Sequence, residues 1–159
     1  MDKKHNLAII LFRPEIPPNT GNIIRLCANT GAQLHLVKPL GFPLQDNKLK
    51  RAGLDYHEYA NVVVHEDWFY CQQHFSGRRI LAIETCGNKY YHNMEYKFDD
   101  VLLFGSETKG LPQYVIDEIG LENTLRLPML AGQRSLNLSN SVGIVTYHAW
   151  NKLGFIGGL

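Results

Sequence analysis

The 159-residue chain has almost no excess charge, few cysteines and no long apolar run. Lys and Arg number 16 against 15 Asp and Glu, so the net charge of +1 excludes binding to nucleic acid through bulk charge. An RNA-binding role would need local basic patches. No apolar run approaches the ~20 residues that span a bilayer. Residues 1–6 lack the apolar core of a signal peptide, so we expect a cytoplasmic protein with no membrane span.

The cysteines and histidines form no metal-binding pattern. Cys27, Cys71 and Cys86 are odd in number and contain no CxxC pair, which argues against a disulfide framework and against a zinc site. The seven histidines show no HExxH spacing. We therefore expect no metal. Residues 105–110 match neither the GxGxxG fingerprint nor a P-loop, so neither nucleotide-binding motif is present.

What the chain does contain is an alternation of short apolar runs with helix-like stretches. Hydrophobic residues make up 45% of the chain, which is typical of a folded protein. The length suits one domain, and we expect it to span residues 1–159. The runs predict strands at 7–12, 34–37, 62–64, 80–83, 101–104 and 125–127. The stretches between them predict helices at 19–30, 66–75, 112–119 and 138–153. This order predicts an α/β fold with a mainly parallel sheet covered by helices on both faces.

In such a sheet, ligands bind beyond the carboxyl ends of the strands. Three of the predicted strands are followed by loops of small and polar residues, at 84–87, 105–110 and 128–135. These loops are the first candidates for a ligand site.

The predicted first helix carries a possible anion ligand. We expect Asn19 to cap this helix and Gly31 to end it. Helical spacing places Arg25 on a face with Gly21, Asn22, Ala28 and Asn29. A solvated arginine on a polar face and a guanidinium that holds a phosphate or a developing oxyanion both fit this pattern.

Two later segments also join small and polar residues. In 103–112, Gly105 directly follows an apolar run, so Glu107 is either presented at the ligand edge of the sheet or part of a solvated turn. We expect Pro112 in the first turn of the next helix. In 134–141, hydroxyls and amides crowd a helix start beyond what one cap needs, which favours a polar or anionic ligand. The helix that follows is apolar nearly all round, which indicates burial or contact with a second subunit.

A local basic patch lies between residues 48 and 57. It combines Lys48, Lys50 and Arg51 with Tyr56 and His57. A solvated loop explains such a charge run, and so does an RNA-facing surface in which rings stack on unpaired bases.

Three of these segments resemble the three motifs of the SPOUT class of RNA methyltransferases, in the same order and spacing. The matching residues are Asn19-x-Gly21-x-x-x-Arg25, Phe104-Gly105-x-Glu107-x-x-Gly110 and Ser135-Leu136-Asn137-Leu138-Ser139-Asn140. Residues 14–31 and 51–58 also resemble the TrmL (YibK-type) branch, the tRNA 2′-O-methyltransferases. Mild departures are Ser106 and Lys109, where close relatives often have proline and arginine.

The resemblance implies a C-terminal trefoil knot, S-adenosylmethionine as cofactor, S-adenosylhomocysteine as product and a homodimer. It implies methylation of the ribose 2′-hydroxyl of the wobble cytidine or uridine, nucleotide 34, of leucine tRNAs. For the cofactor it implies contacts from Ile83, Thr85, Gly105, Leu127 and Ser135. For catalysis it implies Arg25 as the principal residue, with Asn19, Glu107 and Ser139 organising the site.

A single domain of this length implies that the tRNA anticodon stem-loop is read by the dimer itself. We expect local cations to carry that contact, namely Lys48, Lys50, Arg51 and Arg134, and RNA affinity to fall steeply with salt. Two alternatives are a SPOUT methyltransferase for another tRNA or rRNA site and a non-catalytic nucleotide- or RNA-binding module.

Overall fold

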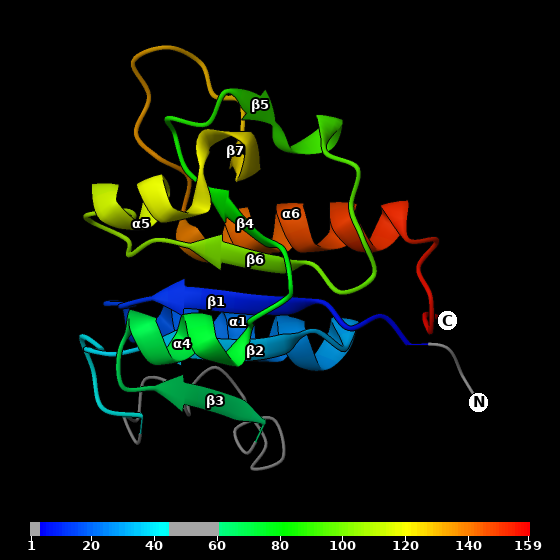
Figure 1. Cartoon of the computed structure of the whole chain (residues 1–159), viewed down its shortest axis with the longest axis horizontal. Helices are drawn as coiled ribbons and strands as arrows, with labels where there is room; N and C mark the ends of the chain where they lie inside the picture. Colours follow the sequence, from blue (N-terminus) through cyan, green and yellow to red (C-terminus); the bar gives the residue numbers. More distant parts are fainter. Residues whose placement is uncertain (1–3, 45–60) are drawn as a thin grey trace.

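The computed structural model describes residues 4–44 and 61–159, and their strands form one parallel sheet. The strands are β1 (Ala8–Phe12), β2 (Gln33–Val37), β3 (Val62–His65), β4 (Ile80–Ile83), β5 (Lys89–Tyr90), β6 (Val101–Phe104) and β7 (Thr124–Arg126). Their order across the sheet is β3-β2-β1-β6-β4-β7-β5, with each neighbouring pair parallel (Figure 1).

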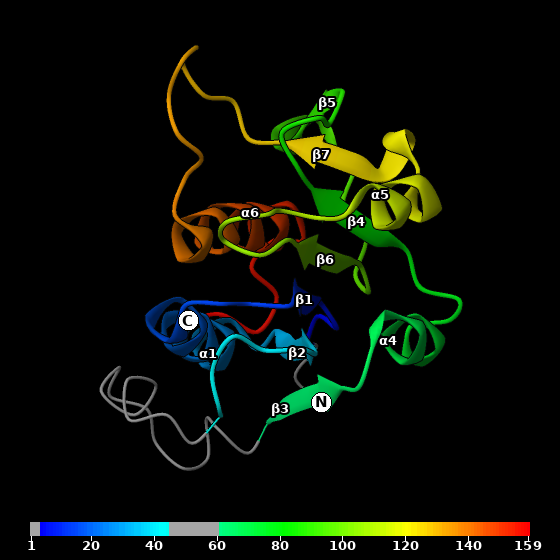
Figure 2. The ribbon, with the colours of Figure 1, turned by 90° about the vertical axis from the view of Figure 1, so that its left-hand side faces the viewer.

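Helices lie on both faces of this sheet (Figure 2). The α-helices in the described part of the chain are α1 (Pro17–Thr30), α4 (Trp68–His74), α5 (Gln113–Ile119) and α6 (Leu138–Lys152). Helices α1 and α6 cover one face and pack against each other, whereas α4 and α5 cover the opposite face. Two 3-10 turns, η1 (Tyr91–Asn93) and η2 (Leu121–Asn123), complete the elements.

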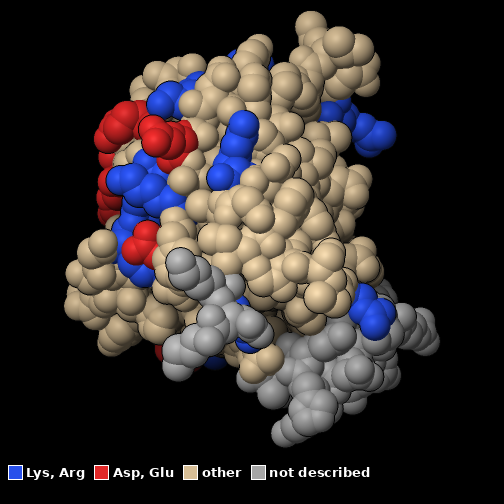
Figure 3. Space-filling model, turned by 90° about the vertical axis from the view of Figure 1, so that its right-hand side faces the viewer, with Lys and Arg blue, Asp and Glu red and all other residues tan. Residues whose placement is uncertain are grey.

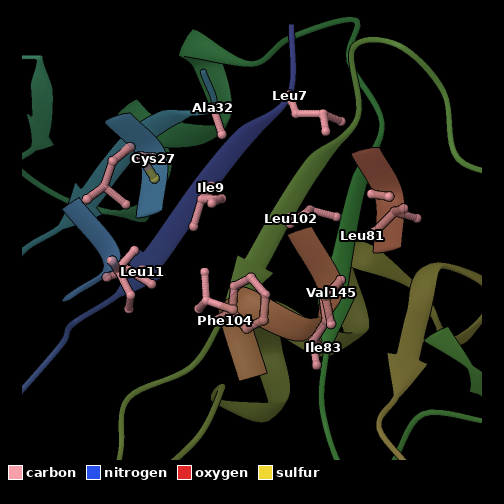
Figure 4. Close-up of a cluster of buried hydrophobic side chains, with 14 of the residues drawn as sticks. Leu7, Ile9, Leu11, Cys27, Ala32, Leu81, Ile83, Leu102, Phe104 and Val145 are labelled. Carbon is pink, nitrogen blue, oxygen red and sulfur yellow. The ribbon is translucent and has the colours of Figure 1, made fainter. Parts of the chain in front are cut away.

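Strand β1 shows why both faces need cover. Successive side chains of a strand point to opposite faces. Ile9 and Leu11 accordingly join a core with α1 and α6 (Figure 4), and Ile10 and Phe12 join a second core with α4 and α5. Since all five residues of β1 are buried, the unbroken apolar run is the signature of a central parallel strand.

Helix α1 begins earlier than expected. Asn19 does not cap it, because the helix starts at Pro17 and its N-cap position is Ile16, which makes no side-chain cap. Two consecutive prolines fit this start, since proline has no N–H to leave unpaired in the first turn. The other end is as predicted: Gly31 adopts φ 81° and its N–H bonds the carbonyl of Cys27 at 2.9 Å.

The α/β prediction and the six expected strands are confirmed, and no strand bound differs from its expectation by more than one residue. Strand β5 was not expected, because two exposed residues carry no apolar pattern. Pro112 occupies the N-cap of α5, one position before the first turn in which we expected it. No helix among the described residues is long and apolar enough to cross a membrane.

Candidate functional site

A cavity of about 430 Å³ opens at the carboxyl ends of β4 and β6 and beside the segment after β7. Its volume lies in the range of small-molecule sites. The start of α1 and the residues before α6 close its other sides. The residues that line it include Ile16, Asn19, Ile83, Glu84, Thr85, Phe104, Gly105, Glu107, Leu127, Ser135, Asn137 and Ser141.

The cavity brings together residues that are far apart in the sequence. All five cofactor contacts implied by the resemblance line it: Ile83, Thr85, Gly105, Leu127 and Ser135. Asn19 and Glu107 line it as well, whereas Arg25 and Ser139 are not among its lining residues in the described part of the chain. The three ligand-edge loops identified from the sequence therefore meet at one place.

Gly105 shapes the turn that forms one wall. A Cβ at this position would overlap the backbone of Gly110, which closes the turn through a bridge between Ser106 and Gly110. Glu84 ties this turn to β4: its carboxylate accepts hydrogen bonds from the N–H of Leu111 (2.5 Å) and of Thr85 (3.0 Å). Sequence reasoning placed Glu84 in the ligand-edge loop 84–87 but gave it no role, because a lone acid after a strand has no distinguishing signal.

Glu107 holds the start of α1. Its carboxylate accepts hydrogen bonds from the backbone N–H of Glu15 (2.9 Å) and Ile16 (2.7 Å), at the positive end of the helix dipole. Burial raises the pKa of Glu107, and these N–H donors oppose that shift. In return, the Glu15 carboxylate accepts from the Thr108 hydroxyl at 2.7 Å, a bond that lowers the pKa of Glu15. Hydrogen bonds from each side therefore join the segment before α1 to the loop after β6.

A chain of hydrogen bonds joins the starts of α1 and α6. The Asn137 amide donates to Asn19 Oδ1 at 3.0 Å. Asn137 Oδ1 accepts from the Ser139 hydroxyl (2.6 Å) and from the Ser139 N–H (2.9 Å), so Asn137 also caps α6. Ser139 therefore belongs to the site through Asn137, which the sequence placed in a crowded helix start without giving it a role.

Arg25 lies farther along α1, on the exposed side of the helix with Asn22, Ala28 and Asn29. Gly21, expected on that same face, is buried, in a helix that packs against α6. Arg25 therefore lies on the same helix as the lining residue Asn19 but on its exposed side.

Helix α6 buries only part of its apolar surface. Val142, Val145 and Ala149 are fully buried in the core, but Ile144 and Tyr147 are 40% and 43% exposed. The prediction that this apolar helix is either buried or shared is therefore met on one face, and its other face carries exposed apolar side chains.

The charged groups do not form a single-sign surface. On the face in Figure 3, basic and acidic side chains lie side by side at one edge and most of the remaining surface is uncharged. Arg134 is exposed next to the lining residue Ser135. Lys48, Lys50 and Arg51 lie outside the described residues. Across residues 4–44 and 61–159, no group of three or more metal-ligating side chains is arranged to hold a metal ion.

Residues 6–147 match the SpoU rRNA methylase family. The chain belongs to the SpoU methylase family. This membership confirms the resemblance to RNA methyltransferases, and it covers all three motifs that line or flank the cavity.

Known relatives of this SpoU methylase extend over nearly the whole chain. A tRNA (cytidine(34)-2′-O)-methyltransferase from Methylovorus glucosotrophus is 55% identical over 95% of this chain and 98% of its own. A solved structure whose description concerns the 2-OH methylation of C/U34 on tRNA has a TM-score of 0.88 to this chain. The two are 39% identical, over 95% of this chain and 98% of the other. An AdoMet-bound rRNA methyltransferase from Sinorhizobium meliloti has a TM-score of 0.81 at 27% identity, over 96% of this chain and 58% of its own.

The cavity of the SpoU methylase fits an S-adenosylmethionine cofactor in its chemistry. Ile83, Phe104 and Leu127 supply apolar walls for a nucleobase, and Thr85 and Ser135 supply hydroxyls. The carboxylate of Glu84 is the kind of group that suits a ligand with a positively charged sulfonium centre. Gly105 lines the cavity without a side chain, so a ligand meets only main-chain groups of this residue.

Proposed function

We propose that this chain is an S-adenosylmethionine-dependent tRNA 2′-O-methyltransferase that acts on the ribose of cytidine or uridine 34 in leucine tRNAs. The observation that carries the proposal is the convergence of three separate motifs on one cavity. The choice of nucleotide 34 is supported by the relative from Methylovorus, and leucine tRNA by the TrmL-type resemblance. Such an enzyme would work in the cytoplasm, where it meets tRNA.

Methyl transfer to a ribose hydroxyl requires the protein to align the two reactants and to stabilise the charge that develops. S-adenosylmethionine supplies an activated methyl group on a positively charged sulfur. A ribose hydroxyl is a weak nucleophile unless the negative charge that forms on its oxygen is stabilised. The residues of the chain therefore have two tasks: to fix the hydroxyl in line with the methyl donor and to stabilise that oxygen.

Arg25 is suited to the second task. A guanidinium stays protonated in proteins, so it is a poor general base and a good electrostatic clamp. We assign it to the 2′-oxygen or the adjacent phosphate, with the proton leaving to phosphate or water. Helix α1 sets the place of Arg25, and that helix is fixed by Glu107 at its first residues and by Asn137 through Asn19. Asn19, Glu107 and Ser139 act in this scheme as positioning residues.

The proposed enzyme is a dimer, and its chain carries the trefoil knot of the SPOUT class. Two features support a dimer: Ile144 and Tyr147 are exposed on α6, and Arg25 stands on the outer side of α1 outside the cavity lining. A second subunit against α6 would cover the apolar side chains.

A substrate lacking a single oxygen tests the function. An anticodon stem-loop of a leucine tRNA is incubated with labelled S-adenosylmethionine, beside the same RNA with a 2′-deoxyribose at nucleotide 34 only. We expect label on the first RNA and none on the second. Equal labelling of both would contradict methylation at this hydroxyl. Thermal unfolding with S-adenosylhomocysteine, which must raise the Tm if it binds the folded chain, checks the cofactor separately.

A further inference from the structure

A second hollow, of about 550 Å³, lies beside the cofactor cavity at the β5 edge of the sheet. Its lining residues are Gly87, Asn88, Lys89, Tyr90, Asn93 and Arg126. Two chain segments connect it to the first cavity: Thr85 precedes Gly87 by two residues, and Leu127 directly follows Arg126. Tyr90 and Arg126 are partners in the pairing of β5 with β7, so the aromatic ring and the cation are carried by adjacent strands.

The hollow carries a preformed aromatic platform. The rings of Tyr90 and His92 stack with centroids 5.8 Å apart and planes 22° apart, and both residues are exposed. Tyr91, which lies between these two residues in the sequence, holds the turn to the rest of the fold. Its ring packs edge-on against His148 of α6, and its carbonyl accepts a hydrogen bond from the Tyr96 hydroxyl at 2.6 Å. One face of Tyr90 is thus taken by His92, while the ring as a whole stays 46% exposed.

The rest of the lining is polar and basic. Lys89 and Arg126 are exposed cations, and Asn88 and Asn93 offer amide donors and acceptors. Among residues 4–44 and 61–159, no acidic residue lines the hollow. Gly87 allows this wall to form, since a Cβ there would lie 2.6 Å from the carbonyl carbon of Leu125 in β7. Exposed rings for bases, cations for phosphates and amides for base edges are what proteins present to single-stranded RNA.

We propose that this hollow binds an unpaired nucleotide of the RNA substrate, with its base stacked on Tyr90 and its phosphates held by Lys89 and Arg126. The proposal rests on the proposed function, because it takes the substrate to be RNA. It adds a surface that none of the three motifs contains. An acidic protein partner would use the two cations but would gain nothing specific from the stacked rings and the amides, so RNA fits the full set better.

Binding of a fluorescent anticodon stem-loop RNA to the full chain at several salt concentrations tests the proposal. We expect Tyr90→Ala to weaken binding roughly 5- to 150-fold, the range for one lost base stack, and Tyr90→Phe to retain it. The double variant Lys89→Ala with Arg126→Ala should flatten the slope of log K against log salt by about 1.4, or about 0.7 per phosphate contact. Lys97→Ala is the matched control, an exposed lysine in the segment before β6.

The variants must keep the fold and the cofactor site. Their Tm, and the rise in Tm with S-adenosylhomocysteine, should equal those of the unmodified chain. If Tyr90→Ala and the double variant bind RNA as tightly as Lys97→Ala, with the same salt slope, the hollow serves another partner and the proposal is wrong. Failure of the unmodified chain to bind or methylate RNA would overturn the proposed function itself, which separates the two outcomes.

Discussion

At the scale of single residues, the site divides into groups that shape the cavity and groups that work from outside it. Gly105 and Glu84 shape the wall, and Asn137 joins two helix starts. Arg25 stands apart on the exposed side of α1. This division means that loss of Arg25 and loss of a wall residue should have different effects on cofactor binding and on methyl transfer.

Substitution Arg25→Ala should leave cofactor binding intact and lower the rate of methyl transfer by ~100-fold or more, the scale of one lost oxyanion donor. Single-turnover methylation and the Tm rise with S-adenosylhomocysteine measure the two effects. An unchanged fold with lost cofactor binding would show instead that Arg25 belongs to the pocket.

Substitution Gly105→Ala, unlike Arg25→Ala, should weaken cofactor binding. Its Cβ would overlap Gly110, so the turn must open and cofactor affinity should fall with methylation. Gly143→Ala is the control, because a Cβ at Gly143 meets nothing within 4 Å and alanine favours the helix. Calorimetric titration with S-adenosylhomocysteine measures the affinity of each variant for the cofactor product. Equal affinities in the two variants would refute the role of Gly105.

At the scale of helices and strands, contacts between distant segments determined the elements and bounds that the sequence pattern did not predict. The apolar run of β1 and the glycine after α1 were enough to place β1 and the end of α1. Strand β5 was missed because it forms only by pairing with β7. The start of α1 was placed two residues late because Asn19 was taken as its cap, although Pro17 and Pro18 are the local signal for the start. The bond from Ile16 to Glu107, which also holds this start, spans 91 residues. The bond between Asn19 and Asn137 spans 118 residues and has no local signal.

The edge formed by β2 and β3 carries a titratable pair. His35 is 1% exposed, and its Nδ1 lies 2.9 Å from Nε2 of His65. Burial, and then repulsion from His65, His74 and Arg78, lower the pKa of His35 to about 3 from an ordinary 6.5. Because the unfolded chain takes up this proton first, stability is full above about pH 6.5 and falls as the pH drops towards 3.

The free energy of unfolding should therefore fall by about 2 kcal/mol between pH 7 and pH 5 for His35 alone. Urea unfolding at each pH measures it. In His35→Leu that part of the pH dependence should disappear. A dependence of the same size in His35→Leu, or none in the unmodified chain, would contradict the assignment.

The junction of β4 and β6 rests on a buried ion pair. Asp100 is fully buried, and both of its oxygens accept from the Arg79 guanidinium, at 2.8 and 2.7 Å. Asp100→Ala should cost about 2–3 kcal/mol of unfolding free energy, below the ~3–5 kcal/mol of a fully buried pair, because Arg79 is partly exposed. Asp99→Ala, at an exposed neighbour, is the control. Equal loss in both would argue against the pair.

At the scale of the whole molecule, the near-zero net charge constrains how RNA is bound. A chain without a basic surface overall must use local groups, and Lys89, Tyr90 and Arg126 form such a group beside the cavity. The exposed Ile144 and Tyr147 on α6 argue for a second subunit on the face that also bears Arg25.

Light scattering at micromolar concentration should accordingly give twice the 18.1 kDa mass of one chain. Ile144→Glu should shift the mass towards one subunit, because a charge in an apolar interface is left without a partner. Val63→Glu, at an exposed residue of β3, should leave the dimer intact. A mass of one subunit for the unmodified chain would refute the dimer.

We propose that one cavity, built from three distant motifs, directs a methyl group onto a ribose. Incubation with labelled S-adenosylmethionine and bulk tRNA, followed by digestion and nucleoside mapping, tests it most directly. We expect label on the 2′-oxygen of nucleotide 34, and its loss in Arg25→Ala. No label, or label on a base rather than on a ribose, would contradict it.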